Sequence, residues 1–482
     1  MDIRESADWI KQAAQVRPSP RQLAWQRMEF YSFVHFGMNT FTDREWGLGT
    51  EDPAIFNPTQ LDARQWVSAF KAAGMRGVIL TAKHHDGFCL WPSQYTDHSV
   101  KNSPWKNGQG DVVGELATAC REAGLKLGLY LSPWDRHEPV YGDSPRYNAF
   151  FLNQLTELLT QYGELFCLWF DGACGEGPNG KRQVYDWQAY YQRIRELQPN
   201  AVISVMGPDV RWCGNEAGKV RDSEWSVVPT EMFDQDRIAG ESQQTDERRF
   251  AERLEMWTPD LGSRERIRQA SGLIWYPAET NTSIRPGWFY HSSEDEQVRS
   301  LENLVDLYFS AVGGNSNLLL NLPPDRRGLV HETDVARLEA LGNFIRGTFR
   351  TNLAVGAQVS ASSTHAGNPL IAAEHIVDDK DETYWAAEAG VEQAELLIEM
   401  DEPRAFDVIR LQEQIEEGQR IEQCAIDIQT ASGWEQIGRT TTFGYQRLLR
   451  FPLVSTRRVR LRILRARYSP TIKAVGLYKA HG

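Results

Sequence analysis

Over about the first 340 residues, short apolar runs alternate with segments whose apolar residues recur at helical spacing. Near-continuous apolar runs are typical of strands that are covered on both faces. They lie at residues 30–38, 77–83, 127–132, 165–170 and 201–205, with later candidates at 273–276 and 317–322. Repeated β–α units joined by short turns predict a parallel sheet, and this many of them favour a closed (β/α)₈, or TIM, barrel over an open sheet.

The segments between these runs carry helix signals. Trp66, Phe70 and Ala73 recur at i, i+4 and i+7, and their helix is predicted to begin at Asn57-Pro58 and to end at Gly74. Further helices are predicted at 113–123, 152–162, 190–197 and 335–345. The charged and loosely periodic stretch 229–270 is interpreted as a helical insertion over one rim of the barrel.

The pattern changes after Arg350, where strands become short and alternating and helical periodicity disappears. Residues 458–463 read Arg-Val-Arg-Leu-Arg-Ile, a strict period of two that predicts one buried and one basic face. We interpret the arginines as a solvated strand face. The chain is therefore predicted to hold a barrel at residues 1–349 and a β-sandwich at residues 350–482, an α/β domain followed by an all-β domain.

Charge and composition exclude several classes of protein. The 482 residues include 52 Lys and Arg against 65 Asp and Glu, a net charge of −13, whereas nucleic acid and anionic membranes bind basic surfaces. Six cysteines without a Cys-x-x-Cys pair indicate neither a disulfide framework nor a zinc cassette. No apolar run approaches the ~18 residues of a spanning helix, and the polar N-terminus lacks an apolar signal core, so we expect a soluble protein. The 16 tryptophans offer aromatic faces on which sugars stack.

Histidines, carboxylates and tryptophans follow the predicted strands, where a parallel barrel collects its chemistry. These residues are His35, Glu45, Trp46, His84, His85, Tyr130, Trp169, Asp171, Glu216, Glu279 and Trp288. Imidazoles and carboxylates bond hydroxyl groups and indoles cover C–H faces, which suits a sugar. Cleaving a glycosidic bond requires two carboxyls, one ionised and one carrying a proton. Asp171, directly after an apolar strand, would be held rigidly, and Glu216 on a loop would reach the opposite side of the bond.

Five motifs together resemble glycoside hydrolase family 29, the α-L-fucosidases. They are FVHFGMNTF, TAKHHDGFCLW, LWFDGA, GWFYH and GGNSNLLLNLPPDRRGL, which occur in order within residues 20–345. The resemblance implies a retaining enzyme whose nucleophile is Asp171. It also implies that His35, His84, His85 and Glu45 bind fucose hydroxyls, that Trp46, Trp169 and Trp288 line the pocket, and that Tyr130 contacts the substrate.

The acid/base residue needs a separate argument because its position varies within this family. The stretches FDGACGEGPNGKRQVYDW and GPDVRWCGNEAG resemble the subgroup that acts on α-1,3/1,4-linked fucose in branched, Lewis-type glycans. That resemblance implies Glu216 as acid/base, with Glu224 and Glu279 as rivals. IVDDKDETYWAAE in the second domain is similar to discoidin-type carbohydrate-binding sandwiches, and we interpret its Tyr384-Trp385 pair as core.

The sequence thus predicts a retaining exo-α-L-fucosidase that acts on fucosylated oligosaccharides or glycoconjugates, without a nucleic-acid or membrane partner. No metal or organic cofactor is implied. A metal site at His84-His85-Asp86 is disfavoured because neighbouring strand residues point to opposite faces. Two alternatives stay open: a fucosidase of relaxed linkage preference, accepting α-1,2 links and aryl fucosides, and a non-catalytic fucose lectin.

Overall fold

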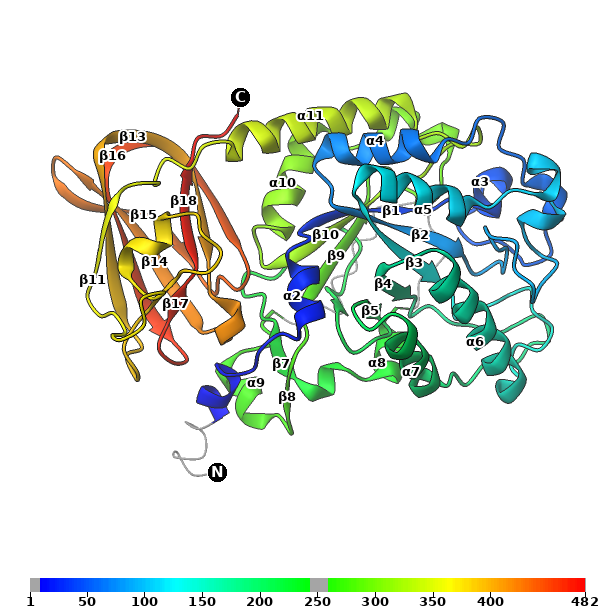
Figure 1. Ribbon diagram of the computed structural model, residues 1–482, viewed down its shortest axis with the longest axis horizontal. Coiled ribbons are helices and arrows are strands. Elements are labelled where there is room, and N and C mark those ends of the chain that lie inside the picture. Colours follow the sequence, from blue (N-terminus) through cyan, green and yellow to red (C-terminus); the bar gives the residue numbers. More distant parts are fainter. Residues whose placement is uncertain (1–8, 243–258, 482) are drawn as a thin grey trace.

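A computed structural model describes residues 9–242 and 259–481 of the chain (Figure 1). Its larger part is a nearly closed barrel of eight parallel strands in the order β5-β4-β3-β2-β1-β10-β9-β6. A single parallel bridge between Ser204 and Val210 joins the two ends of the sheet. The strands are β1 (Phe30–Val34), β2 (Gly77–Lys83), β3 (Lys126–Leu131), β4 (Leu165–Phe170), β5 (Val202–Val205), β6 (Arg211–Trp212), β9 (Ala278–Ser283) and β10 (Ser316–Asn321). The predicted barrel is confirmed.

Helices surround the barrel, and two end as predicted at Gly74 and Gly124, both in the left-handed conformation. The long ones are α4 (Ala63–Ala73), α5 (Val112–Ala123), α6 (Ser144–Gln161), α7 (Trp187–Leu197), α10 (Leu301–Ala311) and α11 (Glu332–Phe349). The short ones are α2 (Pro20–Gln26), α3 (Met38–Thr42), α8 (Gln235–Glu241) and α9 (Arg264–Gln269). The predicted start at Asn57-Pro58 is wrong. Asp62 caps α4 instead, because its carboxylate accepts the backbone N–H groups of Arg64 and Gln65.

The apolar run at 273–276 is a strand, β8 (Leu273–Trp275), but it pairs antiparallel with β7 (Val227–Pro229) outside the barrel. The barrel strand is β9, whose sequence AETNTS is polar although all six residues are buried. Its polar groups are satisfied inside the protein, as by the 2.7 Å bond between Thr280 Oγ1 and Ser316 Oγ. Within the predicted insertion at 229–270 the structure shows α8 and α9, while residues 243–258 lie outside the described residues.

The C-terminal region is antiparallel, as predicted, with strand order β11-β13-β16-β14-β15 and β18 paired to β13. Its strands are β11 (Gln358–Ala361), β12 (Trp385–Ala386), β13 (Ala394–Gln412), β14 (Ile421–Thr430), β15 (Gly433–Thr440), β16 (Arg447–Ala466), β17 (Thr471–Ile472) and β18 (Ala474–Tyr478). Trp385 is buried in its core. Arg460 and Arg462 both pair with Asp427 on the neighbouring strand, so the basic face is partly neutralised.

The two regions are packed against each other, with the C-terminal sheets beside α10 and at the end of α11 (Figure 1). Val408, Leu448 and Tyr478 from the C-terminal region belong to the hydrophobic core of the barrel. All six cysteines are free thiols. Among the described residues, no helix has both the length and the apolar character needed to cross a membrane.

Candidate active site

A cavity of about 620 Å³ lies among the residues that follow the barrel strands. The residues to which the sequence assigns a catalytic or sugar-binding role all line it: His35, Glu45, Trp46, His84, His85, Tyr130, Trp169, Asp171, Glu216 and Trp288. Sequence reasoning missed Trp212 and Asn281, which also line the cavity and are joined by a 2.8 Å bond from Trp212 Nε1 to Asn281 Oδ1. Asn281 was missed because its strand, β9, is polar.

Asp171 directly follows β4, and its side chain is 22% exposed to the cavity. Its Oδ2 accepts the Tyr130 hydroxyl at 2.9 Å and lies 3.6 Å from His85 Nε2, while Oδ1 accepts the Ala173 backbone N–H at 2.9 Å. Burial raises the pKa of Asp171, and the bonds from Ala173 and Tyr130 act in the opposite direction. A carboxylate that is held in one position and still reaches the cavity is suited to act as a nucleophile.

Three histidine rings stand together on the cavity wall, with ring centroids 4.1 Å apart for His84 and His85 and 5.6 Å apart for His35 and His84. His35 Nδ1 lies 2.8 Å from Asn321 Oδ1, and His85 Nδ1 lies 2.7 Å from Ser132 Oγ. Burial lowers the pKa of His35 and of His85 to about 3, and lowers that of His84 well below its usual value. The rings are therefore neutral near pH 7 and can bond hydroxyl groups without carrying charge.

His84, His85 and Asp171 each offer a ligand atom, and these atoms lie within 4.8 Å of one another. Among the described residues this is the group with spacing suited to a metal ion. It contains Asp171 where the set considered from the sequence contains Asp86. Asp86 instead accepts the Phe88 backbone N–H at 2.8 Å, and burial raises its pKa to about 7. The expectation that no metal is needed stays a prediction.

Glu45 holds the loop that carries Trp288. Its carboxylate accepts the backbone N–H groups of Trp288 at 2.8 Å and Phe289 at 3.1 Å, and it lies 2.7 Å from His291 Nε2. His291 Nδ1 in turn lies 2.5 Å from Asp43 Oδ1. Asp43 and His291 were not predicted as site residues, although both flank predicted ones. The segment after α3 and the loop after β9 are thus joined beside the cavity.

The three predicted tryptophans contact other lining residues through their rings. Trp169 stacks on Tyr130 at 5.3 Å with an interplanar angle of 23°. Trp46 meets His85 edge-on at 5.6 Å, and Trp288 lies 5.1 Å from His35. Indole faces beside hydroxyl-binding groups form a surface suited to a sugar ring.

Comparison with known proteins decides the family. A profile of the alpha-L-fucosidase family matches residues 2–348, and a profile of the F5/8 type C domain matches residues 358–474. The chain belongs to the α-L-fucosidase family, glycoside hydrolase family 29. It is therefore a glycoside hydrolase of the α-L-fucosidase class, with a discoidin-like C-terminal domain.

Relatives cover nearly the full chain. Alpha-L-fucosidase 1 of Arabidopsis thaliana is 44% identical over 467 residues, which span 96% of this chain and 87% of that protein. A Ruminococcus gnavus GH29 fucosidase solved in complex with fucose is 33% identical, with a TM-score of 0.85 over 97% of this chain and 95% of that one. A glycoside hydrolase 29 family member from an unknown rumen bacterium is 41% identical, with a TM-score of 0.79 over 97% and 78% of the two chains.

Three glutamates are candidates for the acid/base of this α-L-fucosidase family member, and the structure places them differently. Glu216 lines the cavity, where its Oε2 accepts the Trp288 indole N–H at 3.2 Å. Glu279 is fully buried within β9, where it accepts bonds from Tyr31 and, at 2.6 Å, from the Trp169 indole. Burial raises the pKa of Glu279 to about 7, but the residue is not among those that line the cavity.

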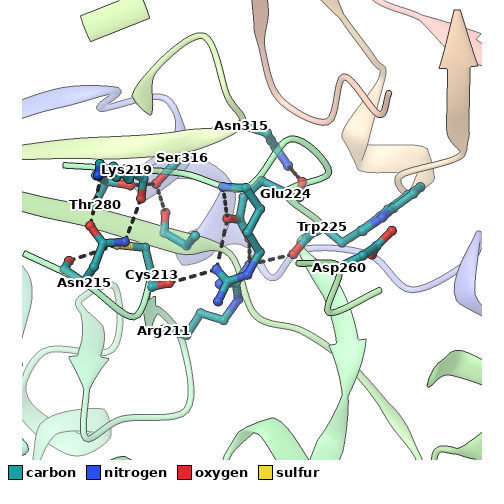
Figure 2. Close-up of polar contacts among 12 residues, drawn as sticks. Arg211, Cys213, Asn215, Lys219, Glu224, Trp225, Asp260, Thr280, Asn315 and Ser316 are labelled. Atoms are coloured by element: carbon teal, nitrogen blue, oxygen red, sulfur yellow. Dashed lines mark hydrogen bonds and ion pairs between the residues drawn. The ribbon is translucent and has the colours of Figure 1, made fainter. Parts of the chain in front are cut away.

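Glu224 is also fully buried and pairs with Arg221 and with Arg211. Figure 2 shows the Glu224 and Arg211 side chains together. Burial alone would raise its pKa, but the two arginines outweigh burial and hold the pKa below its usual value. An ionised carboxylate between two arginines, away from the cavity lining, is a poor proton donor to a substrate. Of the three glutamates, Glu216 is the one that shares the cavity with Asp171.

Proposed function

We propose that the chain is a retaining exo-α-L-fucosidase that removes α-1,3/1,4-linked fucose from branched, Lewis-type glycans. The observation that supports this proposal best is that Asp171 and Glu216, the proposed nucleophile and acid/base, line one cavity together with the histidines and tryptophans named above. The linkage preference rests on the likeness of the Asn215-Glu216 segment to the α-1,3/1,4 subgroup. We also propose residues 1–349 as the catalytic unit and residues 350–482 as the accessory unit.

In the proposed first step, an Asp171 oxygen attacks C1 of fucose and a protonated Glu216 donates its proton to the departing glycosidic oxygen. The aglycone leaves as an alcohol, and fucose remains as an ester on Asp171. In the second step Glu216, now ionised, removes a proton from water, which attacks C1 and releases fucose while Asp171 regains its charge. Each carboxyl returns to its starting protonation state.

The remaining lining residues bind the sugar in this proposal. Neutral His35, His84 and His85 bond the fucose hydroxyls, and Tyr130 holds the Asp171 carboxylate in position through its 2.9 Å bond. Trp46, Trp169 and Trp288 cover apolar parts of the ring. Glu45 is expected to bind fucose while it anchors the Trp288 loop, because one carboxylate can accept several bonds.

Fucose release from a Lewis a or Lewis x trisaccharide, an aryl α-L-fucoside and 2′-fucosyllactose tests the linkage. We expect the Lewis sugar to react fastest. Asp171→Asn should keep less than about 1% of the turnover yet still bind fucose, whereas Glu216→Gln should lose about 100-fold or more on the Lewis sugar. Glu196→Gln on the surface of α7 is the matched control. Rapid turnover of 2′-fucosyllactose with slow release from the Lewis sugar would instead support relaxed linkage preference, and binding without any turnover would indicate a lectin.

A further inference from the structure

Glu216 lies on a loop, residues 213–219, which we call the acid/base loop. Asn215 closes this loop from within, because its Oδ1 accepts the backbone N–H groups of Ala217 and Lys219, both at 3.1 Å. Its Nδ2 donates to the Lys219 carbonyl at 3.0 Å, and Figure 2 shows Asn215 beside Lys219. Asn215 is buried. The conformation of the loop is therefore set by its own side chain, and the position of Glu216 depends on where the loop is attached.

The acid/base loop is attached through Cys213. The Cys213 backbone N–H donates to the Glu279 carbonyl at 2.9 Å, and the Cys213 carbonyl accepts Arg221 Nη1 at 2.8 Å. Arg221 Nη1 also lies 3.2 Å from Glu224 Oε2, and Glu224 Oε1 pairs with Arg211. The buried Glu224 carboxylate thus fixes the arginine that holds the loop.

The backbone around Glu224 is held from the other side by the C-terminal domain. Gln419 Oε1 accepts the Ser226 N–H at 2.7 Å, and Gln419 Nε2 donates to the Glu224 carbonyl at 3.2 Å. Arg447 Nη2 donates to the Asp222 carbonyl at 2.8 Å, and the Thr441 hydroxyl donates to the same carbonyl. Segment 222–226 therefore faces the acid/base loop through the Glu224 side chain and the C-terminal domain through its backbone.

Barrel and C-terminal domain share a further contact at this place. Asn315, in the turn before β10, donates from Nδ2 to the Glu224 carbonyl at 2.7 Å and accepts the Tyr445 N–H at 2.7 Å on Oδ1 (Figure 2 shows the Asn315–Glu224 bond). Gln419 and Asn315 are both buried. If one of these hydrogen bonds is removed, water does not replace the lost partner, and the polar group left without a partner costs its full desolvation free energy. Hydrogen bonds and ion pairs therefore connect the C-terminal domain to Cys213 through segment 222–226 and Arg221.

We propose that the C-terminal domain is a positioning element of the active site: Gln419, Thr441 and Arg447 hold segment 222–226, and Glu224 with Arg221 transmits that position to the loop that carries Glu216. This inference rests on the proposed role of Glu216 as acid/base. Glu224 is then a positioning residue rather than the proton donor. The domain acts on proton donation even if it binds no sugar of its own.

Two aryl fucosides of similar size test the proposal through their leaving groups. The 2-chloro-4-nitrophenolate leaves without protonation, whereas the 4-methoxyphenolate needs a well-placed acid, and kcat/KM reports the first, bond-breaking step for both. In Gln419→Leu we expect kcat/KM for the methoxyphenyl fucoside to fall about 10-fold or more and that for the chloronitrophenyl fucoside to change by less than about 2-fold, because a small displacement of the acid affects only proton donation. Glu224→Gln should show the same split.

Thr441→Val removes one hydrogen bond, made by a partly exposed hydroxyl, and replaces Gln419→Leu as the test if that variant fails to fold. We expect kcat/KM for the methoxyphenyl fucoside to fall about 2- to 5-fold relative to that for the chloronitrophenyl fucoside. Gln423→Leu is the matched control, because its side chain contacts Arg439 on the neighbouring strand. Equal losses on both substrates, or no loss, in the variants that fold would overturn the proposal. Glu216→Gln, measured in parallel, separates the positioning role of the C-terminal domain from the acid/base role of Glu216. If only Glu216→Gln loses more kcat/KM on the methoxyphenyl fucoside than on the chloronitrophenyl fucoside, the positioning role is rejected. If Glu216→Gln shows no such difference, Glu216 is not the acid and both hypotheses are rejected.

Discussion

At the scale of single residues, the Tyr130 hydroxyl makes Asp171 easier to ionise. Its bond to Asp171 Oδ2 lowers the pKa of Asp171, against the larger effect of burial, which raises it. Tyr130→Phe removes the bond and should raise this pKa further. Because a nucleophile must be ionised, activity is lost as pH falls through the pKa of Asp171, so the acid limb of kcat/KM should move to higher pH in the variant.

The measurement is kcat/KM for an aryl fucoside from about pH 3 to pH 8, the interval in which carboxyl groups of this kind titrate. Tyr162→Phe is the control, since the Tyr162 hydroxyl donates to Asp111 instead, at 3.0 Å. The cavity histidines should not contribute to this limb, because burial holds the pKa values of His35 and His85 at about 3 and that of His84 well below its usual value. An acid limb that stays in place, or moves to lower pH, would show that Tyr130 does not control Asp171.

Residues that follow apolar strands could be predicted from the sequence, because a parallel barrel brings the ends of its strands to one rim. Asp171 and His35 are of this kind, and both line the cavity. His291 could not be found in this way. Its importance depends on contacts with Asp43 and Glu45, about 250 residues away along the chain, which no local pattern encodes.

At the scale of elements, the loop at 287–291 depends on carboxylates from the segment after α3. His291 places one ring nitrogen on Asp43 and the other on Glu45, and Glu45 accepts the Trp288 backbone N–H. His291→Phe keeps a ring in the site but removes both bonds. We expect Trp288 to lose its fixed position and fucose to bind about 10-fold more weakly, a loss comparable to that of one or two bonds.

Calorimetric titration with fucose measures this loss, and it should be made in the Asp171→Asn background to prevent turnover of contaminating fucosides. The control is His331→Phe, because His331 stacks on Tyr290 nearby, whereas the histidine that contacts Glu45 is His291. If fucose affinity in His291→Phe equals that of the control, the loop does not need the Asp43–His291–Glu45 contacts.

Elements were predicted well where one face or both are apolar and poorly where they are polar. The predicted strands at 77–83 and 165–170 have the observed bounds of β2 and β4. β9 was missed because its buried polar residues bond partners on other elements, as Thr280 bonds Ser316 on β10, and a hydrophobic pattern cannot show this. The two-residue strand β6 is too short to have a period.

At the scale of the whole molecule, the sequence indicated two kinds of domain but not how much they share. Leu448 lies on β16 of the C-terminal domain, yet its side chain belongs to the barrel core and its backbone N–H donates to the Gly313 carbonyl at 3.0 Å. Such a contact depends on the folded shapes of both domains. The alternation that predicts buried residues covers 458–463 and does not extend to Leu448, so the sequence shows neither that this side chain is buried nor what it packs against.

This shared core predicts that the two domains unfold together. Leu448→Ala should lower the free energy of unfolding by about 3 kcal/mol, as for other buried leucines, and should shift one transition that includes the barrel. Leu453→Ala on the same strand is the control, because Leu453 is 57% exposed and its loss should change stability by less than about 0.5 kcal/mol. Urea unfolding followed by tryptophan fluorescence and by circular dichroism gives both values. Two separate transitions, with only the smaller one shifted by Leu448→Ala, would mean that the barrel is stable without its neighbour, and that the contact at β16 is a surface contact rather than shared core.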